Sequence, residues 1–241
     1  MSLLRGEAIK LFTTRTTWAM LGIGLLAEAL FVGLYVGLSS LGEIGEFEEV
    51  TAGVGLLLLL VLVLGVLVIT TEFRHGTASS TFLVSPRRWP VLVAKLAAAL
   101  LVGLLAGLAF VVVNAGLGLP LYEGKGGQPP GTDDLVSLYA GVVVSFGLIC
   151  AFGFGIGAIV RAQVGAIITA IAVVVVLSPL PLLLPGSVGD YFPSQAIGSL
   201  HGSEEGEGSL NQVGGGLVLG AWTAALAALG TLLVTRRDVA E

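Results

Sequence analysis

Charged residues are scarce in this sequence. Asp, Glu, Lys and Arg make up only 11% of its 241 residues, against roughly 25% in an ordinary soluble domain, while 55% are apolar. A water-soluble fold of this length would have too few polar side chains to cover its surface. The composition therefore excludes a soluble protein and indicates one that lies in lipid, in agreement with a mean hydropathy of +1.00.

Residues that bind metals or carry out catalysis are also scarce. The one cysteine, Cys150, excludes an internal disulfide and any zinc cluster built on cysteines. Two histidines, His75 and His201, and no H-E-x-x-H pattern exclude an intramembrane metalloprotease. The nearest approach to a phosphate-binding loop, at 118–126, has the wrong spacing and no hydroxyl residue. We therefore expect no catalytic residue, metal or cofactor in this chain, and no enzyme activity.

Long apolar stretches take the place of such motifs. A hydrocarbon core about 30 Å thick needs roughly 20 helical residues. Five charge-free stretches are long enough, and a sixth qualifies if it includes one carboxylate, Glu28. We predict an all-α, polytopic membrane protein with a single transmembrane domain, residues 1–241. Its six spans are expected at about 17–40, 50–71, 91–119, 135–160, 162–184 and 213–235.

The distribution of charge along the chain indicates its orientation. With the N-terminus inside, the inner segments hold 10 of the 11 basic residues, and only Lys125 lies outside. The outer loops then hold 11 of the 16 acidic residues. Because Lys and Arg concentrate in cytoplasmic loops, we predict a multi-pass protein of the cytoplasmic membrane with both termini in the cytoplasm.

The first residues predict a separate amphipathic helix. The apolar residues of segment 2–15 fall on one helical face, with Glu7 at its edge and Lys10 turned away. These apolar residues are Leu4, Ala8, Leu11 and Phe12. We expect this helix to lie in the inner membrane interface, with a cytoplasmic extension of the first span as the alternative.

The external loop between the fifth and sixth spans has two notable parts. It covers residues 179–213 and begins with prolines, which should break the fifth span near its outer end. Its segment 194–200 is apolar enough to rest on the outer leaflet or to re-enter the membrane, and both alternatives stay open.

Within the predicted spans, Glu28 is the one unusual group. A carboxylate deep in a span costs about 2.5–3.5 kcal/mol on insertion scales and usually faces protein or water. Our hypothesis is that Glu28 lines a polar part of a transport path. A hydrogen-bonded or protonated contact between helices is the equal alternative.

Three G-x-x-x-G pairs mark faces where helices can pack closely. They are Gly33 with Gly37, Gly103 with Gly107, and Gly153 with Gly157. With 36 glycines in the chain some such pairs are expected by chance, so they identify no partner.

The segment between the second and third spans resembles a known family. It reads Glu72-Phe73-Arg74-His75-Gly76-Thr77, followed by Ser85-Pro86-Arg87-Arg88 and Lys95. This pattern is similar to the first cytoplasmic loop of the ABC type-2 permeases, the membrane subunits of ATP-driven exporters. The opening LLRGEAIKLFTTRTTWAML and the ending Thr235-Arg236-Arg237-Asp238 are also similar to that family, so the resemblance covers essentially the whole chain.

The resemblance implies a site for a partner subunit. Residues 74–86 would form a cytoplasmic coupling helix that docks in a separate nucleotide-binding subunit. The residues that it assigns to this coupling are Glu72, Arg74, His75, Gly76, Thr77, Phe82, Arg87 and Arg88. ATP and Mg would be bound by the partner subunit, and no cofactor by this chain.

The resemblance also implies a function and an assembly. The chain would be a permease subunit that exports an amphipathic or apolar substrate, such as a drug, antibiotic, peptide or lipid. Its partners would be the ATPase subunit, the lipid bilayer and a second copy of this permease, with a related permease as the alternative to the homodimer. We expect no nucleic-acid partner.

Two other functions stay open. An ion- or proton-coupled secondary transporter would use Glu28, although such transporters normally show several ionisable groups at the midplane and often an internal repeat. A non-transporting membrane scaffold would not require the structured, basic loop that begins at Glu72.

Overall fold

A computed structural model describes residues 2–39, 47–51, 53–76, 88–184, 186–202 and 210–236, and over these ranges the chain is helical without strands. The α-helices are α1 (Ser2–Thr13), α2 (Arg15–Leu38), α3 (Phe47–Val50), α4 (Val54–Arg74), α6 (Arg88–Val113), α7 (Leu119–Gly124), α8 (Thr132–Val160), α9 (Gln163–Ile171), α10 (Pro193–Leu200) and α11 (Gln212–Arg236). Two π-helical turns, η1 (Asn114–Gly118) and η2 (Ala172–Val176), extend α6 and α9. Two short 3₁₀ segments, η3 (Leu180–Leu183) and η4 (Gly186–Tyr191), precede α10.

Five helical stretches of the described chain are long and apolar enough to cross a membrane, which fits a multi-pass membrane protein. They are Arg15–Leu38, Val54–Arg74, Trp89–Gly124, Thr132–Val160 and Gln212–Thr235. The predicted span 162–184 is the exception. Its regular helix covers only Gln163–Val176, which at about 1.5 Å per residue is roughly 20 Å long. Helix length therefore confirms five of the six predicted spans.

Both π-helical turns come shortly before a proline. The carbonyl of Asn114 accepts a hydrogen bond from the N–H of Leu119, directly before Pro120. The carbonyl of Ala172 accepts one from Leu177 at 2.9 Å, two residues before Pro179. Proline cannot donate and its ring crowds the carbonyl four residues back, so a wider turn relieves the clash. After η1 the chain continues as α7, whereas after η2 it leaves the helix.

Helix α8 is the centre of the bundle and packs against α4, α6 and α11. Glycines permit the close approach, because a Cβ at Gly65 of α4 would collide with the backbone of Cys150, and one at Gly103 of α6 with the backbone of Phe146. Gly153 of α8 similarly faces the backbone of Leu62. A Cβ at Gly33 or Gly37 would meet open space, so among the described residues this pair is not a close contact between helices.

The outward faces of the bundle are apolar. Leu34 of α2 is 61% exposed, Val112 of α6 is 72% exposed and Leu217 of α11 is 70% exposed. A continuous apolar surface of this kind is unfavourable in water and favourable against lipid chains. The surface thus agrees with the lengths of the helices.

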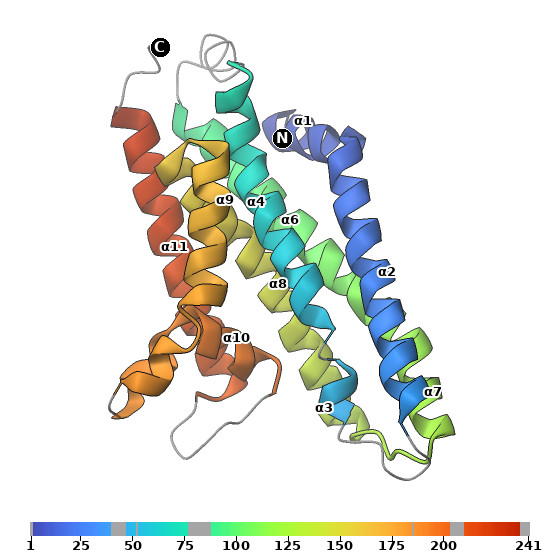
Figure 1. Ribbon diagram of the computed structural model, residues 1–241. Coiled ribbons are helices and arrows are strands. Elements are labelled where there is room, and N and C mark those ends of the chain that lie inside the picture. The colour runs from blue at the N-terminus through green and yellow to red at the C-terminus, as the bar shows by residue number, and fades with distance from the viewer. Residues whose placement is uncertain are drawn as a thin grey trace.

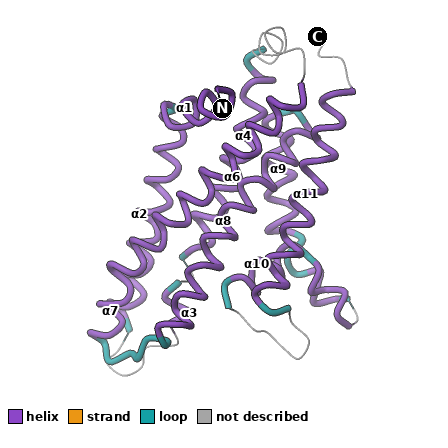
Figure 2. The backbone as a smooth tube through the Cα atoms, turned by 180° about the vertical axis from the view of Figure 1, so that it is seen from behind, coloured by secondary structure: helices purple, strands orange, loops and turns teal. Residues whose placement is uncertain are grey.

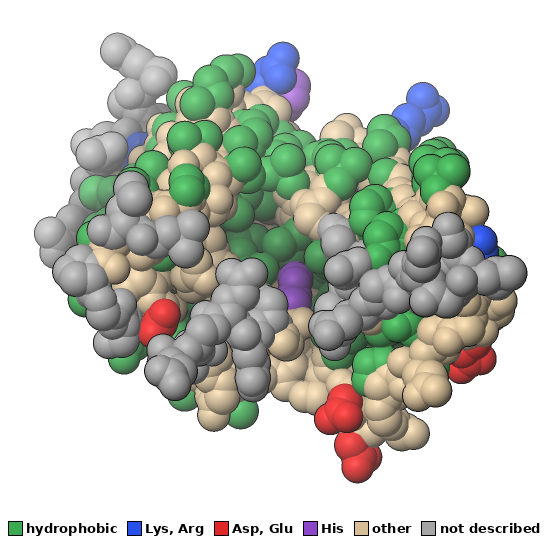
Figure 3. All heavy atoms as spheres, turned by 60° about the horizontal axis from the view of Figure 1, so that its bottom comes forward, with side chains coloured by type: hydrophobic (Ala, Val, Ile, Leu, Met, Phe, Trp, Pro, Cys, Tyr) green, Lys and Arg blue, Asp and Glu red, His purple; other side chains and the backbone are tan. Residues whose placement is uncertain are grey.

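The two ends of the bundle differ. Figures 1 and 2 show α1 across one end, where α11 also finishes, and α3, α7 and α10 at the opposite end. In Figure 3 acidic side chains lie on the face toward the viewer, which is this second end. The segment 194–200 forms most of α10, which packs on α11 and α8 with Ala196, Ile197 and Leu200 buried.

Candidate functional site

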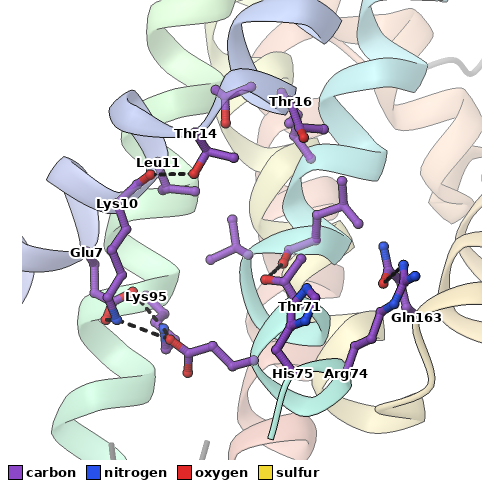
Figure 4. Close-up of a pocket in the computed structure, with 15 residues that line it drawn as sticks. Glu7, Lys10, Leu11, Thr14, Thr16, Thr71, Arg74, His75, Lys95 and Gln163 are labelled. Carbon is purple, nitrogen blue, oxygen red and sulfur yellow. Dashed lines mark hydrogen bonds and ion pairs between the residues drawn. The ribbon is translucent and has the colours of Figure 1, made fainter. Parts of the chain in front are cut away.

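Four charged residues meet where α1, α4 and α6 converge. The Nζ atom of Lys95 lies 2.6 Å from Glu7 Oε2 and 2.6 Å from Glu72 Oε1. The Nζ atom of Lys10 lies 3.0 Å from Glu7 Oε1 and 3.2 Å from Glu72 Oε1. Figure 4 shows Glu7, Lys10 and Lys95 pointing toward one another across this junction. Two cations and two anions make the ionic cluster neutral.

Burial differs strongly within the ionic cluster. The side chain of Lys95 is 2% exposed, those of Glu7 and Glu72 are 9% and 14% exposed, and that of Lys10 is 57% exposed. Lys95 is therefore the inner cation, and the two carboxylates depend on it for compensation of their charge. Burial alone lowers the pKa of Lys10, but its hydrogen bonds and charge interactions with Glu7 and Glu72 outweigh this and raise the pKa above 10.5.

Local chain geometry brings these residues together. Thr14 is extended and separates α1 from α2, so that α1 turns across the end of the bundle and packs on α6. Glu72 lies in the last turn of α4, which ends at His75 and Gly76. Gly76 has φ +65, a left-handed conformation that glycine adopts without strain and that commonly terminates helices.

The end of α4 is also tied to the opposite side of the bundle. The Nη1 atom of Arg74 donates to Gln163 Oε1 at 3.0 Å, at the start of α9. The guanidinium of Arg161, in the turn between α8 and α9, lies 5.5 Å from the centroid of the Phe73 ring and donates to the carbonyl of Leu233 at 2.8 Å. Residues 72–74 thus connect α1 and α6 on one side with α8, α9 and α11 on the other.

A cavity of about 600 Å³ adjoins the ionic cluster. Its lining combines apolar side chains of α4 with hydroxyl and charged groups (Figure 4). The apolar part includes Leu64, Leu67 and Val68, and the polar part includes Thr14, Thr17, Thr71, Glu72 and Arg74. A cavity of this size and mixed character suits an amphipathic small molecule.

The described residues include part of the predicted coupling site. Glu72 belongs to the ionic cluster, Arg74 contacts Gln163, and His75 and Gly76 are exposed at the end of α4. Arg88 is the first residue of α6. Most of the predicted coupling helix, residues 77–86, lies outside the described residues, and so do the coupling residues Thr77, Phe82 and Arg87.

Sequence reasoning placed Glu7 incorrectly and overlooked the role of Lys95. Glu7 was expected at the edge of the apolar face of the first helix, but it lies on the buried face, 7% exposed, because its carboxylate pairs with Lys95. One signal was available in the sequence. Lys95 is the single cation between residues 89 and 124, and a cation inside an apolar helix requires an anion nearby.

Glu28 belongs to a second polar group, where α2 meets η1 and the chain between α3 and α4. Its Oε1 accepts a hydrogen bond of 3.0 Å from Asn114 Nδ2, and Asn114 Oδ1 accepts one of 3.0 Å from the hydroxyl of Tyr139. Glu28 and Asn114 are fully buried. Glu28 does not line the 600 Å³ cavity, so its role in a transport path stays a hypothesis.

A third polar group joins α10 to α8 and α11. Ser145 Oγ and His201 Nε2 are 2.8 Å apart. Gln212 Nε2 donates to the carbonyls of Ser137 at 2.6 Å and Leu200 at 3.1 Å. Burial lowers the pKa of His201 from 6.5 to about 4, so its ring is neutral at neutral pH. These contacts fix α10 against the bundle.

Within the described ranges, no three His, Cys, Asp or Glu side chains are grouped so that they could hold a metal ion. The polar groups above are therefore ion pairs and hydrogen bonds between helices. No protein-family model matches the chain, and a search of curated proteins found no match.

Proposed function

We propose that this chain is the membrane-spanning permease subunit of an ATP-driven exporter of the ABC type-2 family, with ATP hydrolysed by a separate nucleotide-binding subunit. The observation that carries the proposal is the position of residues 72–74. They precede the segment that resembles the family's coupling helix, and they contact α1, α6 and α9 through Lys10, Lys95 and Gln163.

The orientation is part of the proposal. Since α1 and the end of α11 lie at the same end of the bundle, the chain crosses it an even number of times (Figure 1). We assign six crossings, the fifth made by α9 and η2 together with the segment that follows. The 10 to 1 distribution of basic residues favours this end as the cytoplasmic one, with both termini inside and the acidic end outside.

Coupling follows from the rigid connections of α4. A force applied by a soluble partner to residues 77–87 would reach the end of α4 first. Because the ionic cluster and the Arg74 contact join α4 to its neighbours, that end would move with α1, α6 and α9 as one body. Rigid-body motion of helices is a common way to change access across a membrane.

The substrate class follows from the lining of the cavity. Apolar side chains of α4 and hydroxyls of Thr14, Thr17 and Thr71 suit an amphipathic or apolar cargo. An exporter of this class combines two membrane subunits with two ATPase subunits, so we propose that two copies of this chain, or this chain and a related permease, form the pathway.

Copurification tests the proposal. The chain, extracted from its native membrane in mild detergent, should bring down an ATPase subunit. Replacement of residues 77–86 by a flexible linker of equal length should abolish that recovery. The matched control replaces residues 203–209, in the predicted external loop, by a linker of their own length and should retain the partner. Recovery of the ATPase after the first replacement would count against the coupling assignment.

A proton-coupled secondary transporter is the second candidate, because Glu28 is a carboxyl group inside the bundle. The two candidates differ in energy source. Transport into proteoliposomes that depends on ATP and the ATPase subunit, and that survives a protonophore, favours the exporter. Transport by this chain alone that a protonophore abolishes favours the alternative.

A further inference from the structure

Glu28 is enclosed on every side by protein. It lies in the middle of α2 with 0% of its surface exposed. One carboxyl oxygen, Oε1, accepts the hydrogen bond from Asn114 Nδ2 at 3.0 Å. Asn114 also lies 3.5 Å from the carbonyl of Val50 and accepts from Tyr139, so α2, the α3 segment, η1 and α8 meet around this carboxyl.

The second oxygen, Oε2, is buried and has no hydrogen-bond partner. It lies against the backbone of Gly53, where a Cβ would collide with it, and beside the Phe31 ring, which would be 3.0 Å from the same Cβ. Among the described residues, Glu28 belongs to no group of three or more His, Cys, Asp or Glu side chains that could hold a metal ion. The close packing makes Gly53 a position at which any side chain would displace Glu28.

The charges around Glu28 do not compensate an ionised carboxylate. None of the ion pairs among the described side chains includes Glu28. The groups that face it are the neutral amide of Asn114 on η1 and the backbone of Gly53, which precedes α4. Beyond Asn114 lie the carbonyl of Val50, at the end of α3, and the phenol of Tyr139. An ionised carboxylate with one neutral donor in an apolar interior is strongly unfavourable, and such a group takes up a proton instead.

We propose that Glu28 is a proton-binding site, and that its carboxyl group holds a proton while α2 packs against α4 and η1. The site is built rather than incidental, because Glu28 is fully buried, its Oε1 is held by the amide of Asn114 and its Oε2 has no hydrogen-bond partner. A carboxyl exposed to water is ionised at neutral pH. A motion that admits water between α2 and Asn114 therefore releases the proton, and acidification favours the arrangement in which Glu28 is buried against Asn114 and Gly53.

This proposal goes beyond the exporter assignment and does not depend on the ATPase subunit, so it can be tested on the purified chain in lipid. Infrared spectroscopy in D2O separates the C=O stretch of a protonated carboxyl from that of an ionised one. We expect the wild type to show a protonated-carboxyl band at neutral pH. Glu28→Gln should remove the band completely, whereas Glu123→Gln, a change at an exposed acid, should leave it intact.

A third variant ties the band to the observed geometry. Asn114→Leu removes the donor to Oε1 at similar side-chain volume, so the band should persist and move to higher wavenumber. A wild-type spectrum without a protonated-carboxyl band at neutral pH overturns the proposal whatever the variants do. A band that persists unchanged in Glu28→Gln overturns it as well, because the proton then resides elsewhere.

Discussion

Two carboxylates, those of Glu7 and Glu72, share the buried ammonium group of Lys95. Desolvation of these charges is expensive, and the ion pairs offset that cost only while both signs are present. The exposed Lys10 reaches the same carboxylates from the solvent side, where water screens its interaction. The two lysines should therefore differ strongly in what they contribute to stability.

Lys95→Met is expected to lower the free energy of unfolding by about 3–5 kcal/mol, because it leaves two largely buried carboxylates with only the exposed Lys10 as a partner cation. Lys10→Met should cost about 0–1 kcal/mol. Denaturant unfolding of the detergent-solubilised protein measures both. The triple variant with Glu7→Gln, Glu72→Gln and Lys95→Met should recover most of the loss, since the only charge of the cluster that it leaves unpaired is the exposed Lys10. Equal losses from the two lysine changes would refute this account.

His201 makes stability depend on pH. The unfolded chain takes up a proton near pH 6.5, whereas the folded protein, with the pKa of His201 lowered to about 4 by burial, does so only near pH 4. The contribution of neutral His201 is thus complete above pH 6.5 and is lost as pH falls toward 4. We expect the loss to be at most about 3 kcal/mol, and less because the ring is partly exposed.

Thermal unfolding followed across this pH window checks the expectation. His201→Gln should flatten the decline of the unfolding temperature between pH 6.5 and 4, whereas His75→Gln, a change at an exposed histidine, should not. An identical decline in the wild type and in His201→Gln would exclude His201 as its source.

At the level of elements, hydrophobic pattern alone predicted most helices. The predicted span 17–40 corresponds to Arg15–Leu38, and 135–160 corresponds to Thr132–Val160. Continuous apolar runs of this length are typical of membrane-spanning helices. The prolines were expected to break the fifth span near its outer end, and its regular helix does end at Val176, three residues before Pro179. The third span was predicted to end at residue 119, but its helix continues to Gly124. No sequence pattern shows that a π-helical turn accommodates Pro120.

The candidate site was less predictable than the helices. The resemblance pointed to Glu72 and Arg74, but their partners Lys95 and Gln163 are 23 and 89 residues away along the chain. Glu7 reaches Lys95 because the extended Thr14 turns α1 across the bundle. A single extended residue between two helices has no distinctive sequence pattern. The same holds for Glu28 and Asn114, which are 86 residues apart.

Contact between α4 and α8 depends on particular glycines. Gly65→Ala places a Cβ against the backbone of Cys150, so α4 and α8 must separate, and we expect a loss of about 2–4 kcal/mol in the free energy of unfolding. Gly55→Ala on the same helix meets open space and should be neutral or stabilise by about 0.5–1 kcal/mol. Unfolding measurements on this matched pair test the packing. A tolerated Gly65→Ala would show that the helices are further apart.

For the whole molecule, the two ends of the bundle carry different charges. Basic residues concentrate at the end that holds α1, the ionic cluster and Arg74, and acidic residues such as Asp133 and Asp134 begin α8 at the other end. If the first end faces the cytosol, the basic residues lie on the cytoplasmic side, as is usual in membrane proteins. An ATPase in the cytosol can then reach residues 77–87, and the cavity lies at the same end of the bundle.

Cysteine labelling determines which end faces the cytosol, and the chain is well suited to it. Its one native cysteine, Cys150, is fully buried in α8 and should not react with a membrane-impermeant maleimide. We expect His75→Cys to be labelled only after the membrane is permeabilised, and Asp133→Cys to be labelled in intact cells, since both side chains are exposed at opposite ends of the bundle. Each variant is the control for the other. Labelling of His75→Cys from outside intact cells would place the end of α4 where no cytosolic ATPase can reach it, and the exporter proposal would then fail.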